Sequence, residues 1–184
     1  MKLLFITLTV LQSLLATLEQ KTLVSDFSLS VAEAQAQPIT YTGSLAMHGK
    51  QFTLSMFNME AAYDGNTLYM YSEELEELTL STPTEEELTQ TNPFLYAQAL
   101  LPICQYAEKV VGDKTQITLT PNDQSAGIKK FVLRVTTATL LPTNIEIHEA
   151  EAQTTTLRLS NARYTDETPS FVIEKEGAFI NDLR

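Results

Sequence analysis

This sequence contains few of the residues that support catalysis, metal binding or covalent cross-linking. Tryptophan is absent, Cys104 is the only cysteine, and His48 and His148 are the only histidines. A single cysteine excludes a disulfide within the chain. The serines and threonines form no G-x-S-x-G or S-x-x-K pattern, and the glutamate runs lack EF-hand spacing. We therefore predict a protein that is not an enzyme and that has no catalytic residue, no metal and no cofactor.

Positive charge is also scarce. Lysine and arginine number 12 against 23 aspartates and glutamates, which gives a formal net charge of −11. A strongly acidic surface argues against nucleic acid as a partner and against electrostatic docking on anionic lipid. The glutamates are concentrated at 73–77 and 85–87. We interpret them as a solvated face in preference to a docking patch for a basic partner.

Long apolar runs are confined to the N-terminus, and none reaches the roughly 20 residues that span a bilayer. Residues 1–16 begin with Lys2 and continue as an apolar run, which is typical of a signal peptide cut after Ala16. The same region also fits an amphipathic helix over 9–20, with leucines on one face. The sequence predicts residues 1–16 as a signal peptide or the start of a first helix, and 17–184 as one domain.

The rest of the chain alternates apolar and polar residues with the period of a β-strand. A turn at Asp64-Gly65 separates two such segments, as a tight hairpin requires. The alternation predicts about ten or eleven strands in series, with 177–184 as a tail. The predicted strands are 22–33, 38–48, 51–57, one that ends at Tyr63, 67–72, 75–81, 115–120, 128–136, 143–149, 154–162 and 170–174.

A helical insert interrupts the strand series between residues 82 and 102. Thr84, followed by three glutamates, has the composition of a helix N-terminus. Asn92-Pro93 repeats the signal, with a capping side chain and a proline in the first turn. The second helix is apolar on most sides, so we expect it to be buried against the sheet. Three of its residues form either a lid or an ordinary covering helix: Phe94, Tyr96 and Leu100.

The apolar residues that share a strand face form the candidate ligand-binding set. They would line either a lipid cavity or a packed core, and the alternation alone favours the core. After the turn, Leu68 and Met70 point one way and Tyr69 and Tyr71 the other, and which pair faces inward is open. The candidate set is Phe27, Leu29, Leu45, Met47, Phe52, Leu54, Met56, Tyr69, Phe131, Leu133, Ile145 and Ile147.

The order of these parts resembles the periplasmic outer-membrane lipoprotein carrier family, which is LolA-like. The most specific match is Tyr63-Asp64-Gly65-Asn66-Thr67-Leu68-Tyr69-Met70-Tyr71, which is similar to the DGKTLWFY hairpin of that family. The weaker matches follow in family order: Asp26-Phe27, Gly43-Ser44-Leu45, Phe52-Thr53-Leu54, Asn92-Pro93-Phe94, 117–121 and 127–131. One segment departs from the family, because 47–51 lacks the arginine of the family's K-R-P run.

The resemblance implies a mainly β fold with short helices: a half-open antiparallel β-barrel of about eleven strands, covered by an N-terminal helix and a short helical insert. It also implies a periplasmic carrier that binds the acyl chains of lipoproteins, or other lipids, in an apolar cavity. Its implied partners are an inner-membrane releasing transporter and an outer-membrane acceptor, and we expect a monomer. The alternative is a lipid- or peptide-binding sensor or regulatory domain on the same half-barrel.

Overall fold

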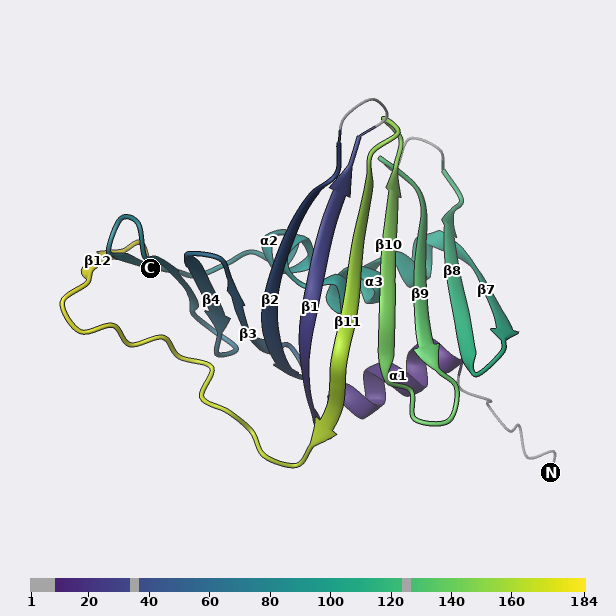
Figure 1. The fold of residues 1–184 in the computed structure, drawn as a ribbon, viewed down its shortest axis with the longest axis horizontal. Helices are drawn as coiled ribbons and strands as arrows, with labels where there is room; N and C mark the ends of the chain where they lie inside the picture. The colour runs from purple at the N-terminus through teal and green to yellow at the C-terminus, as the bar shows by residue number, and fades with distance from the viewer. Residues whose placement is uncertain (1–8, 34–36, 124–126) are drawn as a thin grey trace.

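The computed structural model describes residues 9–33, 37–123 and 127–184, and its architecture is a single curved β-sheet with short helices behind it (Figure 1). Within the described residues the sheet has 12 strands in the order β12-β6-β5-β4-β3-β2-β1-β11-β10-β9-β8-β7. The sheet does not close, because β12 and β7 are its two edges. All neighbours are antiparallel except β12 and β6, which run parallel. The predicted half-open, mainly β fold is confirmed.

The sheet has two halves that differ in strand length. The large half has strands of 8 to 12 residues. These are β1 (Thr22–Ala32), β2 (Ile39–His48), β7 (Cys104–Val111), β8 (Lys114–Pro121), β9 (Ile128–Thr136), β10 (Pro142–Glu149) and β11 (Thr154–Thr165). The small half has strands of 4 to 6 residues. These are β3 (Gln51–Met56), β4 (Met59–Tyr63), β5 (Leu68–Ser72), β6 (Glu77–Ser81) and β12 (Phe179–Asp182).

The two halves meet at a sharp bend beside Gly43 in β2. Gly43 pairs with Phe27 of β1 and with Met56 of β3. A Cβ atom at this position would lie 2.6 Å from Cζ of Phe27 and would also collide with the carbonyl oxygen of Ser55. Only glycine therefore lets the Phe27 ring lie across β2, where it is buried in the core. Figure 1 shows the short strands turning away from the long ones beyond β2.

The helices begin at the capping signals of the sequence. α1 (Val10–Leu18) has a capping box between Thr9 and Gln12, and α2 (Glu85–Thr91) has one between Thr84 and Glu87. α3 (Pro93–Leu100) follows directly and runs into a 3-10 turn, η1 (Leu101–Ile103). Each capping side chain accepts a hydrogen bond from a backbone N–H that the helix leaves unpaired. The predicted first helix and both helices of the insert are confirmed.

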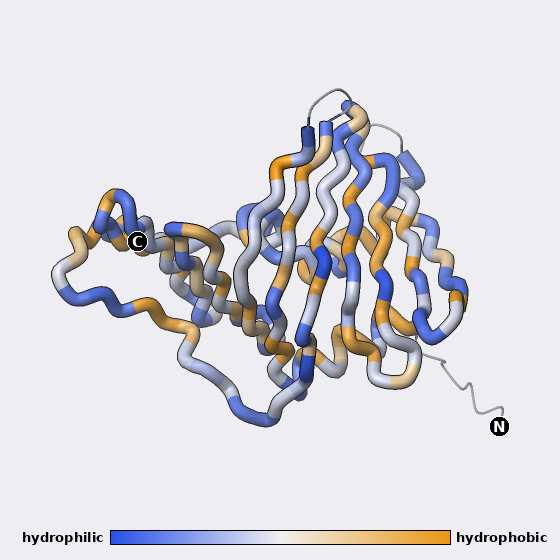
Figure 2. Tube along the Cα trace, viewed as in Figure 1, coloured by the Kyte–Doolittle hydropathy of each residue, from blue (hydrophilic) through white to orange (hydrophobic). Residues whose placement is uncertain are grey.

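The core lies between the inner face of the sheet and the helices. α1 contributes Leu11, Leu14 and Leu18, none more than 1% exposed, and α3 contributes Phe94, Ala97 and Leu100. Figure 2 shows apolar and polar residues alternating along the long strands, so that one face of each strand is apolar. The apolar stripe of each helix packs on that face.

The predicted hairpin turn after β4 is confirmed in detail. The Oδ1 atom of Asp64 accepts hydrogen bonds from the backbone N–H of Asn66 at 2.8 Å and of Thr67 at 2.7 Å. Gly65 has a φ of +105°, which a residue with a side chain rarely adopts. The Tyr69 hydroxyl donates to Oδ2 of the same aspartate at 3.0 Å. The turn residues therefore fix the register between β4 and β5.

The strand predicted over 170–174 is wrong, and so is the tail predicted over 177–184. Residues 170–174 have no regular secondary structure, whereas β12 lies within the predicted tail. The alternation was genuine, because Phe171 and Ile173 are buried and Val172 is exposed. However, this segment packs on the outside of the small half, where Ile173 meets Ala62 and Leu78. Burial of alternate residues thus arises here without a strand ladder.

Other parts of the sheet also differ from the prediction. β7 was not predicted, because its exposed edge position removes the alternation that would mark it. The strand predicted over 75–81 begins only at Glu77, and Leu75 lies in the preceding turn. Residues 1–8 of the predicted signal peptide or first helix lie outside the described residues, as do residues 34–36 and 124–126 between predicted strands.

Candidate functional site

The strand register arranges the inward side chains of β2 to β5 in rows across the sheet. One row consists of Met47, Phe52, Tyr63 and Leu68, which are paired strand by strand. All four are buried in the main core, and Met47 is only 4% exposed. The rings of Phe52 and Tyr63 lie 6.1 Å apart between centroids. This row closes the inner face where α1 ends.

The next rows along the same strands are partly exposed to solvent. The second row is Leu45, Leu54, Ala61 and Met70, and the third begins with the pair Met56 and Met59. Met70 is 38% exposed and Met59 is 43% exposed, although both point to the same face as the buried row. We call these six residues the open strip: Leu45, Leu54, Met56, Met59, Ala61 and Met70. The open strip is an apolar surface with three thioether side chains, which are flexible and polarisable.

The inward residues of the large half have a different environment. Phe131 and Leu133 of β9 are fully buried, and Ile145 of β10 is 1% exposed. The Phe131 ring contacts the Tyr96 ring of α3 edge-on, with centroids 6.1 Å apart. Side chains of the helices thus fill the inner face of the large half.

The structure brings together eleven of the twelve predicted ligand-binding residues on the inner face. Six are buried: Phe27, Met47, Phe52, Phe131, Leu133 and Ile145. Five are partly buried against the same core: Leu29, Leu45, Leu54, Met56 and Ile147. Tyr69 does not join them, because it lies with Ala62, Leu78 and Ile173 in a separate cluster on the outer face. Its neighbours along the strand, Leu68 and Met70, are the pair that faces inward.

The predicted lid residues lie on α3 but differ in exposure. Phe94 and Leu100 are buried in the core, whereas Tyr96 is partly buried against Phe131. Burial raises the pKa of Tyr96, and the nearby charge of Glu149 adds to this, so the hydroxyl stays neutral. We call α2 and α3 together the lid helices.

Asn92 joins the two lid helices and also links them to the sheet. Its Oδ1 atom accepts hydrogen bonds from the N–H groups of Phe94 at 3.0 Å and Leu95 at 3.3 Å. Its Nδ2 atom donates to the thioether sulfur of Met47 in β2 at 3.7 Å, and this contact is buried. A thioether is a weak acceptor. This side-chain hydrogen bond between the lid and β2 is therefore a weak one.

The segment that lacks the family's arginine lies at the end of α1. The backbone N–H of Gly49 donates to the carbonyl of Leu18 at 2.7 Å, and Nδ1 of His48 lies 3.4 Å from the Thr22 hydroxyl. Within this segment, Met47 is the residue whose side chain bonds to the lid. In this segment the hydrogen bond between the lid helices and the sheet is therefore made by a neutral side chain.

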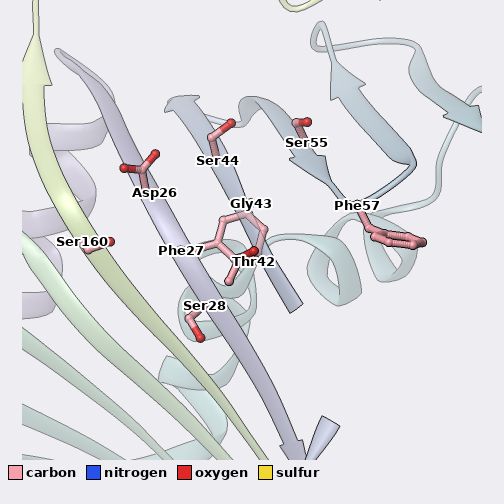
Figure 3. A pocket seen from close by; sticks show the side chains of 9 residues that line it. All are labelled: Asp26, Phe27, Ser28, Thr42, Gly43, Ser44, Ser55, Phe57 and Ser160. Carbon is pink, nitrogen blue, oxygen red and sulfur yellow. The ribbon is translucent and has the colours of Figure 1, made fainter. Parts of the chain in front are cut away.

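The outer face carries polar groups, and hydrogen bonds join some of them to one another. A shallow depression of about 520 Å³ lies near the bend, and its outward-pointing side chains include Asp26, Ser44, Ser55 and Ser160 (Figure 3). Farther along the large half, Glu146 accepts hydrogen bonds from Arg134 and from Asn144. No buried side-chain nitrogen or oxygen lacks a hydrogen-bond partner in the part of the chain that the structure describes. The hydrogen bonds among these polar side chains stabilise the outer face of the sheet.

Among the described residues no three histidine, cysteine, aspartate or glutamate side chains gather where a metal ion could bind. No helix over 9–33, 37–123 and 127–184 is long and apolar enough to cross a membrane.

The predicted site residues did not include Met59 or Asn92, and the direction of Met70 was left open. The inward direction of Met70 was open to inference, because it shares a strand face with Leu68. Met59 begins a strand of only 5 residues directly after a turn, where alternation is too short to read. Asn92 was predicted as a helix cap, and its bond to Met47 depends on a contact between residues 45 positions apart.

Comparison with known proteins locates this architecture within one family. The family model described as "Outer membrane lipoprotein carrier protein LolA" matches residues 19–171. No curated protein sequence matches the chain significantly. An uncharacterized conserved protein from Thermus thermophilus has a similar structure, with 8% sequence identity and a TM-score of 0.63. That match covers 94% of this chain and 96% of the other.

A second solved structure shares the fold. It is the MucA/MucB complex from Pseudomonas aeruginosa, with 15% identity and a TM-score of 0.51. The match covers 88% of this chain and 57% of the other. At such identities the likeness extends to the fold alone.

Proposed function

This chain belongs to the outer membrane lipoprotein carrier protein LolA family, and we propose that it is a periplasmic carrier that binds the acyl chains of lipoproteins and shuttles them towards the outer membrane. The observation that carries the proposal is the open strip. Three methionines, two leucines and an alanine lie side by side on the inner face, and all six keep part of their surface exposed to solvent. Acyl chains would lie along these residues.

An apolar surface that is left open has a physical meaning. Each CH₂ group of an acyl chain that stays in water costs about 0.8 kcal/mol of free energy. A lipoprotein therefore crosses an aqueous compartment only with its acyl chains covered. Met56, Met59 and Met70 can adapt to chains of different length and position. A carrier must also release its load, and a strip that stays partly open provides a route of exit.

Movement of the lid helices would enlarge the apolar surface that the open strip offers. Asn92 joins the two helices, and its side chain makes the weak hydrogen bond to Met47 of β2. Displacement of the lid would uncover the buried row that follows the open strip, beginning with Met47 and Phe52. Acyl chains would thus first occupy the open strip and then enter the space under the lid helices. In this proposal the donor is an inner-membrane transporter, the acceptor is an outer-membrane protein, and no chemical step occurs.

A direct test is the affinity of the purified full chain for a synthetic diacylated peptide without charged residues, measured by calorimetry. Met59→Lys and Met70→Lys each place a charge on the open strip, and we expect each to weaken binding about tenfold or more. Val111→Lys is the matched control, because Val111 is exposed on β7 at the opposite edge of the sheet. We expect this variant to bind like the unmodified chain.

Two outcomes would count against the proposal. If the unmodified chain binds neither the diacylated peptide nor an apolar dye, it does not carry lipid. If all three lysine variants bind equally well, acyl chains do not use the open strip. Thermal unfolding of each variant establishes that a loss of binding does not reflect a loss of structure.

A second candidate function is a sensor or regulatory domain whose ligand is a peptide or lipid and whose output is contact with a partner protein. The filled interior under the helices favours it, because Phe131, Leu133 and Ile145 leave no ready space for acyl chains there. Purification with native partners discriminates the two: recovery of acylated lipoproteins supports the carrier, and recovery of a signalling protein without lipid supports the sensor.

A further inference from the structure

Three chain segments meet at the outer end of the small half. The turn between β3 and β4 contains Phe57 and Asn58, and the carbonyl of Asn58 accepts a hydrogen bond from the N–H of Glu73 at 2.9 Å. Glu73 begins the turn between β5 and β6, in which the carbonyl of Glu76 accepts from the N–H of Phe179 at 2.8 Å. Phe179 is the first residue of β12. These contacts hold two turns and the start of the last strand at one place.

Each of the three segments exposes a large apolar side chain there. Phe57 is 84% exposed, and Leu75 and Phe179 are each 69% exposed. We call these three residues the apolar tip. Single exposed apolar residues are ordinary on protein surfaces, whereas three on adjoining segments mark a surface that contacts another molecule.

The backbone conformation at Phe57 indicates that a phenylalanine at this position lowers the stability of the fold. Met56 pairs with Met59, so Phe57 and Asn58 form a two-residue hairpin turn. Phe57 has a φ of +52°, in the left-handed region that suits asparagine or glycine and is unfavourable for a bulky residue. Glu76 in the neighbouring turn also has a positive φ, of 49°. An exposed phenylalanine in a strained position gains no packing that would offset the strain, which is a feature of functional sites.

The charges around the apolar tip are almost all negative. Glu73, Glu74 and Glu76 flank Leu75, and Glu174 and Glu176 precede Phe179, all of them exposed. The only lysine in these stretches is Lys175. Its Nζ atom is already 2.6 Å from Oε1 of Glu60 and 4.7 Å from the centroid of the Tyr71 ring. The field at the tip therefore attracts positive groups and repels anionic lipid.

We propose that the apolar tip is a docking site for a polypeptide partner that presents an apolar side chain flanked by lysine or arginine residues. The apolar group would pack between Phe57, Leu75 and Phe179, and the basic residues would face the surrounding glutamates. Aromatic anchors within a charged rim are typical of protein interfaces. In this proposal the glutamates around the apolar tip bind the basic residues of the partner and do not serve solvation alone.

The apolar tip lies directly beside the open strip. Met56 and Met59 flank Phe57 and Asn58 directly, so the open strip ends at the apolar tip. A partner bound there would lie at the end of a bound acyl chain, where it could receive or deliver the load. This consequence rests on the proposed carrier function, whereas the docking itself does not.

The test uses a short synthetic peptide with leucines flanked by lysines, and its counterpart with glutamates in place of the lysines. We expect the lysine peptide to bind the full chain in a salt-dependent way and the glutamate peptide not to bind. Phe57→Asn should weaken binding of the lysine peptide about tenfold. The same substitution should raise the unfolding temperature, because asparagine suits the left-handed turn. Leu75→Ser should weaken binding without a comparable gain in stability.

Leu183→Ser is the matched control, because Leu183 is 64% exposed but lies beside Leu80, at the other end of β6. Equal binding of the lysine peptide to the Phe57→Asn and Leu183→Ser variants would overturn the proposal. Binding of phosphatidylcholine vesicles that Phe57→Asn abolishes, without binding of the lysine peptide, would identify the tip as a membrane contact and would also overturn it. The affinity of Phe57→Asn for the uncharged diacylated peptide should be unchanged, which separates this proposal from the carrier function.

Discussion

The two halves of the sheet use the same alternation of residues for different purposes. Phe131 and Leu133 in the large half and Met59 and Met70 in the small half all point to the inner face. The first pair is fully buried, whereas Met59 is 43% exposed and Met70 38% exposed. The difference lies in what covers them, because α1 and α3 pack on the large half, whereas the residues of the open strip stay partly exposed. A strand face therefore becomes packed core or exposed apolar surface according to what covers it.

Strand length and the bend at Gly43 support this division. Long strands give the helices a broad face to pack on, and the short strands beyond β2 turn away from them. The large half thus supplies most of the packed core, and the small half supplies most of the open strip. This division explains how the chain can keep an open apolar strip on a stable sheet.

The largest effect should come from substitutions that compare the two halves directly. Leu14→Ala removes a fully buried side chain of α1 without lowering helix propensity, and we expect a loss of about 2–5 kcal/mol in unfolding free energy. Met70→Ala removes a side chain of similar size from the open strip, and we expect a loss below about 1 kcal/mol. Denaturant unfolding measures both. Equal losses would contradict the division of roles.

A smaller, local effect is expected at Asn92, where the lid meets β2. Asn92→Ala removes the bonds to Phe94, Leu95 and Met47, which should destabilise the lid by about 1–2 kcal/mol. Native-state hydrogen exchange should show faster exchange over 88–97 and little change in β9. Thr84→Ala, which removes the cap of α2 alone, is the control. Equal loss of protection in β9 would mean that the lid and the large half open together.

The smallest effect concerns the acid stability of the large half. Burial would raise the pKa of Glu146, but hydrogen bonds from Arg134 and Asn144 and the charge of Arg134 outweigh it, so the pKa lies below its ordinary value of 4.5. The stabilisation is therefore present above pH 4.5 and is lost as the pH falls through the lowered pKa. The stability difference between the unmodified chain and Glu146→Gln should shrink between pH 7 and pH 3. A stability difference for Glu146→Gln that stays constant between pH 7 and pH 3 would refute the assignment.

Much of the fold could be predicted from the sequence because its signals are local. The turn at Asp64-Gly65, the helix caps at Thr84 and Asn92, and the alternation of the long strands all occur within a few residues. The failures arose where the environment is set from a distance. Phe171 and Ile173 alternate like a strand but pack on the outer face, and β7 loses its alternation at an edge.

The site was less accessible to sequence reasoning than the fold. Eleven of the predicted ligand-binding residues share the inner face, because parity along a strand is a local property. The packing of α1 and the lid helices decides which of these residues are covered. The pattern of residues within a strand carries no information on where those helices pack. Tyr69 was assigned to the inner set because the parity of a strand of 5 residues between two turns is open until its partners are known.

The most direct test of the central claim is the methyl NMR signal of each methionine during titration with the diacylated peptide. Four of the five methionines, Met47, Met56, Met59 and Met70, lie on the inner face at graded depths. We expect the signals of Met56, Met59 and Met70 to shift first, and that of Met47 to follow as the lid opens. A titration that leaves the three open-strip methionines unchanged while the peptide binds would contradict the account.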